Sequence, residues 1–121
     1  MGNIYNLGIQ LAYGEDPEVV VKAFLENFVQ AEKKALSIDF FTQEPLIEDD
    51  EIRAYIGGLA EYLSRATDMS PPRWCHQPIY FLKFPVFWTE LPRDILVANT
   101  PSAFRRRLLF CGDGVSRIFN S

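Results

Sequence analysis

The sequence predicts an all-α protein, a compact single-domain bundle of about five helices with an irregular aromatic and proline-rich segment at residues 71–92. Three observations support this fold class. Apolar residues recur at steps of three and four, capping residues followed by proline or acids mark helix starts, and alternating strand patterns are absent. A chain of 121 residues has the length of one domain and can bury a core without disulfides or metals.

The first two helices are expected over residues 3–13 and 17–36. The sequence Asp16-Pro17-Glu18 is a strong start for the second, because Asp caps a helix, Pro fits its first turn and Glu complements its dipole. The apolar stripe of this second helix follows helical spacing and consists of Val20, Phe24, Phe28, Ala31 and Ala35.

A third helix is expected after residues 37–47, which form a connector with buried aromatic residues. Its start carries the acids Asp49, Asp50 and Glu51, which are favourable at a helix N-terminus. Its stripe consists of Ile52, Ile56, Leu59, Leu63 and Ala66. The pair Gly57-Gly58 inside this helix costs about 1 kcal/mol per glycine relative to alanine. We therefore predict that another element approaches the helix closely at the two glycines.

The second half has weaker signals. Pro71-Pro72 ends the third helix, and residues 71–92 are irregular apart from one short helix over 78–84. Further short helices are expected over residues 92–99 and 101–110, although 107–111 could instead form a short strand. Beyond the break at Gly112-Asp113-Gly114, Asp113 is expected to cap a last turn through Val115, Ile118 and Phe119.

Charge divides the single domain 1–121 into two parts. The acidic helical part, residues 1–70, carries a net charge of −8, and the basic aromatic-rich part, residues 71–121, carries +4. The two parts could neutralise each other by folding together, or the basic part could face a partner. The aromatic content of 14% is high and has two possible explanations, a bulky core or an apolar face that binds a partner.

No targeting or membrane signal is visible in the sequence. The first residues lack the basic and apolar regions of a signal peptide, and no apolar stretch approaches the roughly 18–20 residues that cross a bilayer. We expect a cytoplasmic protein with no membrane contact, in which Cys75 and Cys111 are reduced thiols.

The run Arg105-Arg106-Arg107 lies between apolar residues and is the most informative motif of the chain. On a helix, three consecutive side chains point roughly 100° apart, so they cannot all serve one contact. Some of these guanidinium groups are expected to pair inside the fold, and at least one is expected to face outward. The candidate partner-binding or nucleic-acid-binding residues are Arg105, Arg106, Arg107, Arg117, Trp74 and Trp88.

A purely structural role for the arginines is the competing interpretation. Phe104 and Leu108 would anchor one helix face in the core. One or two arginines would pair with Asp94, Asp113 or Glu61, or stack on Trp74 or Trp88.

Nucleic-acid binding is the alternative function. Residues 92–99 and 101–110 can be drawn as a helix-turn-helix with the three arginines on the second helix. Two observations weigh against it. The N-terminal end of that helix, which normally reads bases, is Pro-Ser-Ala-Phe, and the pI is near 4.9.

No catalytic, metal or cofactor pattern is found. Cys75-His76 is the obvious pair of nucleophile and base, but neighbours in sequence rarely present their side chains to each other. Cys75, His76 and Cys111 offer too few ligands for a structural zinc site, and Gly112-Asp113-Gly114 lacks the length and lysine of a phosphate loop. We expect no enzyme activity, no metal and no cofactor.

The C-terminal half resembles a family of small uncharacterised bacterial proteins. The residues that carry the resemblance are Pro71-Pro72-Arg73-Trp74, Phe84-Pro85-Val86-Phe87-Trp88, Thr100-Pro101-Ser102-Ala103-Phe104-Arg105-Arg106-Arg107 and Val115-Ser116-Arg117. The family pattern runs P-x-W, P-W-F, SP-x-x-F-R-R-R-x-I-F and L-x-R. This chain departs from it in having Leu109 at the Ile position and the order Phe87-Trp88.

The resemblance implies an interaction role. Members of the family tend to be encoded beside helix-turn-helix regulators or nucleotidyltransferase-like proteins, in arrangements like toxin–antitoxin pairs, and no catalytic residue transfers from them. We expect a small non-catalytic protein-interaction or regulatory module of antitoxin-like character. Its partner would be a protein, in the simplest case a co-encoded one. The oligomeric state is left open.

Overall fold

The fold is known from a computed structural model that describes residues 3–34 and 37–120. Within these residues the all-α class is confirmed, with six α-helices and only a two-stranded sheet. The α-helices are α1 (Ile4–Ala12), α2 (Pro17–Lys33), α3 (Asp50–Ala66), α4 (Arg93–Asn99), α5 (Ser102–Arg105) and α6 (Gly114–Phe119). Three 3₁₀ turns and two strands complete the fold, namely η1 (Ser37–Phe41), η2 (Arg73–His76), η3 (Pro78–Tyr80), β1 (Val86–Phe87) and β2 (Leu109–Phe110).

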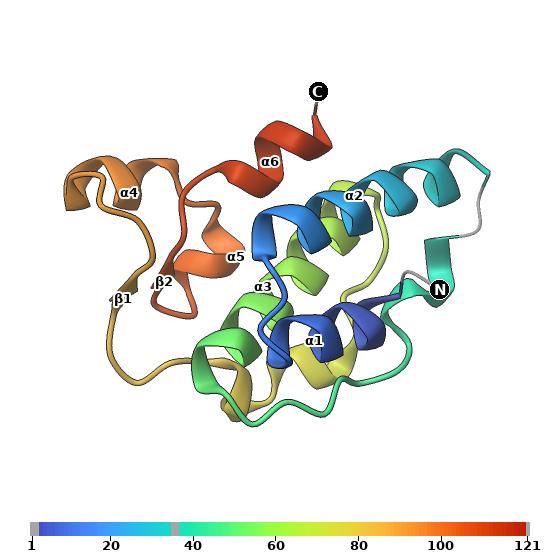
Figure 1. The fold of residues 1–121 in the computed structure, drawn as a ribbon. Helices are drawn as coiled ribbons and strands as arrows, with labels where there is room; N and C mark the ends of the chain where they lie inside the picture. Colours follow the sequence, from blue (N-terminus) through green and yellow to red (C-terminus); the bar gives the residue numbers. More distant parts are fainter. Residues whose placement is uncertain (1–2, 35–36, 121) are drawn as a thin grey trace.

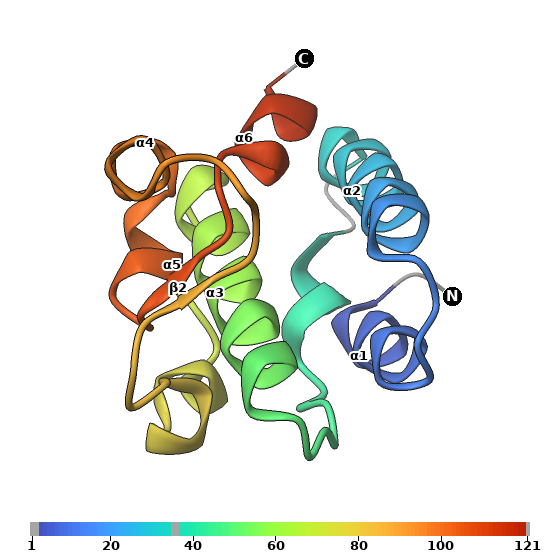
Figure 2. The ribbon, with the colours of Figure 1, turned by 60° about the vertical axis from the view of Figure 1, so that its left-hand side comes forward.

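Helix α3 is the centre of the fold. Figure 2 shows it running between α1 and α2 on one side and α4 and α5 on the other. It packs against α1, α5, η2 and η3, and these elements bury the consecutive residues 54–61 of the helix. The acidic and basic parts of the chain therefore meet across one central helix (Figure 1).

The helix starts expected for α2 and α3 are confirmed. Asp16 accepts a hydrogen bond from the backbone N–H of Glu18 at 3.0 Å, with Pro17 in the first turn of α2. Asp49 does the same for Ile52 at 2.9 Å and begins α3. Helix α2 ends at Lys33, and the part of its prediction that covers residues 35–36 lies outside the described residues.

The two glycines of α3 mark close contacts, as predicted. A methyl group at Gly58 would lie 2.5 Å from the Phe104 ring, so the ring of α5 packs on bare helix backbone. A methyl group at Gly57 would lie 3.0 Å from the Tyr80 side chain and 3.1 Å from the Nε atom of Arg107. The glycines thus let α5 and η3 approach the axis of α3.

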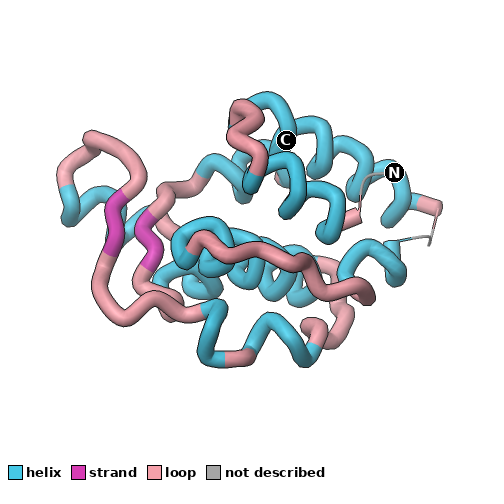
Figure 3. Tube along the Cα trace, turned by 60° about the horizontal axis from the view of Figure 1, so that its bottom comes forward, coloured by secondary structure: helices cyan, strands magenta, loops and turns pink. Residues whose placement is uncertain are grey.

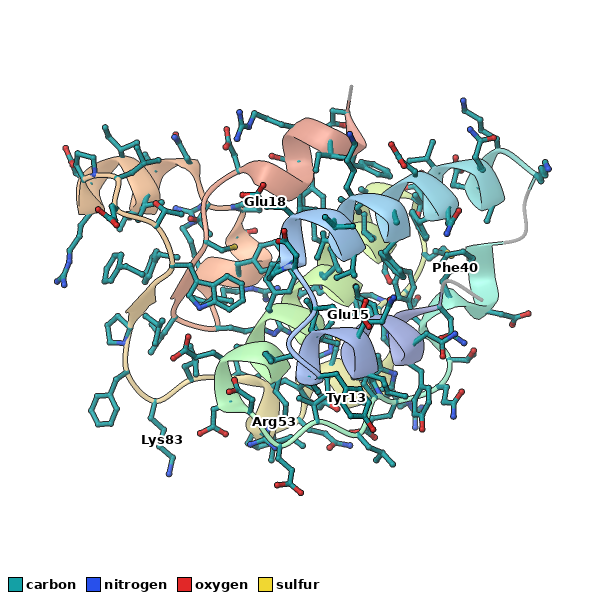
Figure 4. All side chains as sticks on the ribbon, viewed as in Figure 1. Tyr13, Glu15, Glu18, Phe40, Arg53 and Lys83 are labelled. Atoms are coloured by element: carbon teal, nitrogen blue, oxygen red, sulfur yellow. The ribbon has the colours of Figure 1, made fainter. Side chains whose placement is uncertain are left out.

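Residues 71–92 are irregular, as expected, although the short helix predicted over 78–84 is only the single turn η3. Arg53, near the N-terminal end of α3, holds the segment at η3 by donating to the Ile79 carbonyl at 3.2 Å, and it also donates to the Ile47 carbonyl before α3 at 2.8 Å (Figure 4). At its end, β1 pairs in parallel with β2, with Val86 opposite Leu109 (Figure 3).

The helix predicted over residues 101–110 is wrong beyond Arg105, and the short-strand alternative is closer to the structure. Leu108 has a φ of +63°, a left-handed conformation that ends helical continuation. The turn brings Leu109, rather than Leu108, fully into the core, and it places the Phe110 ring 4.8 Å from that of Phe87. Pairing with β1 outweighs the local helical preference.

The aromatic residues chiefly form the core. A connected group of rings on α2, η1 and α6 consists of Phe24, Phe28, Phe40, Phe41 and Phe119. Tyr62 joins this group to Phe104, which stacks on Tyr55. Most of the aromatic excess is therefore accounted for by packing, and the exposed aromatic side chains that remain are the ones that need another explanation.

Candidate interaction surfaces

The three arginines of the run have three different environments. Arg105 is exposed, the Arg106 side chain is 51% exposed, and Arg107 has no exposed surface. The expectation that some pair inside the fold and at least one faces outward is confirmed. The three side chains differ in exposure because α5 ends at Arg105, and Arg106 and Arg107 lie on the turn into β2.

Arg107 is a structural residue. Its Nη1 atom donates to Glu61 and to the Ala103 carbonyl at 2.6 and 2.8 Å, and its Nη2 atom donates to the Cys75 carbonyl at 2.6 Å. The guanidinium also lies 4.4 Å from the centre of the Phe81 ring. Burial lowers the pKa of this guanidinium, and its Nε atom has no hydrogen-bond partner in the described part of the chain.

Glu61 is the carboxylate that gathers these cations. Its side chain is fully buried on α3, and besides Arg107 on Oε1 it binds Arg65 and Arg106, both through Oε2. The Nε atom of Arg65 lies 3.0 Å from that oxygen, and the Nε2 atom of His76 lies 3.9 Å from Oε1. We call this group the Glu61 cluster; its members are Glu61, Arg65, His76, Arg106 and Arg107.

Glu61 was one of three acids predicted to pair with the arginines. Of the other two, Asp113 pairs with Arg117, with 3.1 Å between its Oδ1 atom and Nε, rather than with the run. The prediction that Asp113 caps the last helix is wrong, because its side chain makes no capping hydrogen bond to α6. No ion pair of Asp94 is found in the described ranges. The predicted stacking on Trp74 or Trp88 is wrong for Arg107, because its aromatic partner is Phe81.

Cys75 and His76 lie at the edge of the Glu61 cluster. The Sγ atom of Cys75 lies 3.8 Å from the Nδ1 atom of His76, so the two side chains do approach each other. The thiol is fully buried, however, and burial raises its pKa, which disfavours the nucleophilic thiolate. Desolvation, followed by the charges of Arg107 and Arg65, lowers the pKa of His76. These shifts oppose activation of the thiol.

The two tryptophans, like the arginines, differ in how far they are exposed. Trp74 is buried and donates to the Phe41 carbonyl at 2.9 Å, so it is part of the core. Trp88 is 37% exposed, stacks 5.0 Å from Tyr55 and donates to Glu51 at 2.8 Å. Of the six predicted site residues, the four that reach the surface are Arg105, Arg106, Arg117 and Trp88. Arg107 and Trp74 are interior residues.

Sequence reasoning missed Arg65. It follows Glu61 by four residues on α3, a spacing that places the two side chains on the same face of a helix. That spacing is a signal that could have assigned Arg65 to the same group of charges.

A second surface lies on residues 84–99, which we call the arm. Figures 1 and 3 show α4 at the edge of the molecule, beyond the two short strands. Large apolar side chains are exposed along the arm, namely Phe84 (78%), Trp88 (37%), Leu91 (53%), Ile95 (42%) and Val97 (40%). Within α4 only Leu96 is buried. Lys83, just before the arm, points away from the body (Figure 4).

The described residues contain no group of three or more His, Cys, Asp or Glu side chains that could hold a metal ion. In the same part of the chain, no helix is both long enough and apolar enough to cross a membrane. A hollow of about 1070 Å³ lies between α2 and α6 and is lined by both acidic and basic side chains, including Glu26, Lys22 and Arg117.

Comparison with known proteins finds no matching family model, no similar curated protein and no similar solved structure. The resemblance of the C-terminal half to a bacterial family therefore stays a prediction, carried by the residues quoted for it.

Proposed function

We propose that the protein is a non-catalytic interaction module that docks a partner protein through the arm. The observation that carries this proposal is the exposure of five large apolar side chains within residues 84–97. The other strongly exposed ones in the described chain are spread along it, at Tyr13, Val19, Leu46 and Ile79. Clustered exposure of this kind is typical of protein-binding surfaces.

Helix α4 gives the most specific support. Ile95, Leu96 and Val97 are consecutive, so they point to different sides of the helix. A helix with apolar residues on several sides is normally buried all round, yet α4 buries only Leu96. An apolar groove on a partner would cover the sides that the body of the protein leaves open.

The partner we infer is a protein with an apolar groove that receives α4. Lys83, which projects at one end of the arm, and Arg93 within it are balanced by Glu90 and Asp94, so residues 83–99 carry no net charge. The apolar side chains, rather than charge, would therefore select the partner. The co-encoded protein implied by the bacterial resemblance is the first partner to test.

Nucleic-acid binding is less well supported by the geometry. Arg107 is buried against Glu61, so two arginines of the run are left for phosphate contacts. Helix α5 ends at Arg105, so the run does not lie along a recognition helix.

The test is binding of the purified full chain to the co-encoded protein, with matched surface variants. We expect Ile95→Glu combined with Val97→Glu to abolish binding that the wild type shows, because two charges would enter the apolar contact. The control is Val19→Glu, which adds a charge at a 63% exposed site on α2 and should leave binding intact.

Two results would overturn the proposal. One is equal binding by the wild type and the Ile95/Val97 variant, and the other is failure of the co-encoded protein to bind the wild type at all. Loss of binding with Val19→Glu would also count against it, because it would place the contact elsewhere or reduce it to net charge.

A further inference from the structure

The Glu61 cluster contains more positive than negative charge. Three guanidinium groups meet one carboxylate, and it is the only carboxylate within 4.0 Å of them in the described part of the chain. Arg107 is buried with Glu61 and neutralises it. The other two cations, Arg65 and Arg106, are 59% and 51% exposed and have no second partner among the described residues.

The buried carboxylate of Glu61 orients the guanidinium groups of both Arg65 and Arg106. Arg65 and Arg106 bind the same oxygen atom, Oε2 of Glu61, although one lies on α3 and the other follows α5. Two like charges are thus held side by side by a carboxylate that is itself fully buried and anchored by Arg107. Each guanidinium has several N–H donors and uses only one of them on Glu61, so donors of both remain for a ligand.

His76 extends this group. Its side chain is 43% exposed, and its Nε2 atom lies 3.9 Å from Oε1 of Glu61, so it lies at the margin of the same surface. Its two ring nitrogens face Glu61 and the Sγ atom of Cys75, so the ring borders the two arginines and serves as a reporter of their surroundings.

We propose that Arg65 and Arg106, bordered by His76, form a binding site for a doubly charged oxyanion of the phosphate type. A phosphate group has several acceptor oxygens that match two guanidinium forks, and its two negative charges would balance the two uncompensated cations. Because the buried carboxylate orients both arginines in advance, less side-chain freedom is lost on binding than at two independent surface arginines.

This site is separate from the arm. It uses side chains of α3 and of the residue after α5, whereas the proposed partner surface uses residues 84–97. The Ile95/Val97 variant described above should therefore still bind phosphate, and failure of one proposal leaves the other intact.

The experiment titrates the purified full chain with inorganic phosphate at low ionic strength. His76 is the only histidine, so its ring resonances in an NMR spectrum report directly on this surface. We expect a saturable shift of these resonances, with a dissociation constant in the millimolar range or below. Calorimetry on the same samples gives the affinity.

Matched variants locate the binding. Arg65→Ala with Arg106→Ala should weaken phosphate binding by about tenfold or more, because both guanidinium forks are removed. Arg105→Ala with Arg117→Ala removes the same charge outside the cluster and should leave the affinity close to that of the wild type. Arg65→Lys with Arg106→Lys keeps the charges and loses the forks, so it should bind more weakly than the wild type.

The proposal is overturned if the alanine pair binds phosphate as the wild type does, or if both alanine pairs lose affinity equally. The first result would place binding elsewhere, and the second would reduce it to net charge. If the alanine pair does not fold, the lysine pair decides, because undiminished affinity there would also overturn it. A titration with adenosine monophosphate distinguishes the source. Tighter binding than phosphate indicates a nucleotide ligand, and equal binding indicates that the phosphate group alone is recognised.

Discussion

The Nη1 atom of Arg107 lies 2.6 Å from Oε1 of Glu61, and neither side chain has any exposed surface. The pair joins the two parts of the chain, since Glu61 belongs to the acidic part and Arg107 to the basic part. Buried charges of this kind are costly to separate, because removing one leaves the other uncompensated in a low-dielectric interior. This pair is therefore the first position at which stability can be tested.

Glu61→Gln should lower the free energy of unfolding by about 3–5 kcal/mol, because the buried Arg107 cation would lose its counter-charge. Urea denaturation measures the change. The control is Asp113→Asn in the exposed pair with Arg117, which should cost less than about 1 kcal/mol. Wild-type stability of the Gln variant would contradict the structural role given to the pair.

Gly58→Ala should destabilise the protein by about 1–3 kcal/mol through overpacking, offset in part by the better helix propensity of alanine. The added methyl group would lie 2.5 Å from the Phe104 ring, which must shift to admit it. Thermal unfolding of this variant can be compared with that of Gly114→Ala, where no atom lies within 4 Å of the new methyl group. A Gly58→Ala variant more stable than the wild type would mean that Phe104 does not pack there.

Both cysteines should react slowly with a thiol reagent near pH 8 in the folded protein. Cys75 is fully buried and its thiol pKa is raised by burial, while burial raises the pKa of Cys111 to about 12. In urea both thiols should react at the rate of a free cysteine, as a colorimetric thiol assay would measure. Fast reaction of Cys75 in the native protein would instead support the Cys75–His76 hypothesis for catalysis.

The histidine should titrate with a midpoint below 6.5, since desolvation and then the charges of Arg107 and Arg65 lower the pKa of His76. The folded state thus binds this proton more weakly than the unfolded chain. Its contribution to stability is complete above about pH 6.5 and is lost as the pH falls through that value towards the folded pKa.

An NMR titration of the single histidine measures this midpoint directly, and Arg65→Ala should move it upward because one of the repelling charges is removed. A wild-type midpoint above 6.5 would mean that the Glu61 carboxylate, 3.9 Å away, outweighs the two guanidinium groups.

Within the arm, helix α4 is held on the body by one buried side chain, Leu96. Leu96→Ala is expected to lower the free energy of unfolding by about 2–5 kcal/mol, because Leu96 is fully buried. Val97→Ala, at a side chain that is 40% exposed, should change it by about 0.5 kcal/mol or less. Urea denaturation of the two variants provides the comparison, and equal effects would show that α4 does not pack as described.

Much of the fold could be predicted from local signals. Asp16-Pro17 and Asp49 marked helix starts, and the pair Gly57-Gly58 indicated a close approach that Phe104 and Tyr80 make. These signals work because capping and glycine chemistry act over a few residues. The charge argument also placed Glu61 among the partners of the arginine run.

What could not be predicted depends on contacts distant in sequence. Leu108 is left-handed and a strand follows it because β2 pairs with β1. In this pairing Leu109 lies opposite Val86, which is 23 residues earlier in the chain. Trp74 looked like a surface aromatic, but its indole N–H is taken by the Phe41 carbonyl. Likewise, Arg107 lies against the ring of Phe81 rather than that of a tryptophan because η3, which precedes Phe81, packs against α3. Local propensity carries none of this information.

The parallel pairing of β1 and β2 has a consequence for dynamics. Parallel strands cannot be joined by a tight turn, so the chain from Trp88 to Leu108 must leave the sheet and return in the same direction. That crossover contains α4, the Phe104 ring seated on Gly58, and Arg106 and Arg107. To open, the crossover would have to break the strand pair together with the contacts of Phe104 and Arg107 on α3. In native-state hydrogen exchange this stretch should therefore open as one cooperative unit. The amides of Val86 and Trp88, which donate to the carbonyls of Leu108 and Phe110, would report the free energy of this opening.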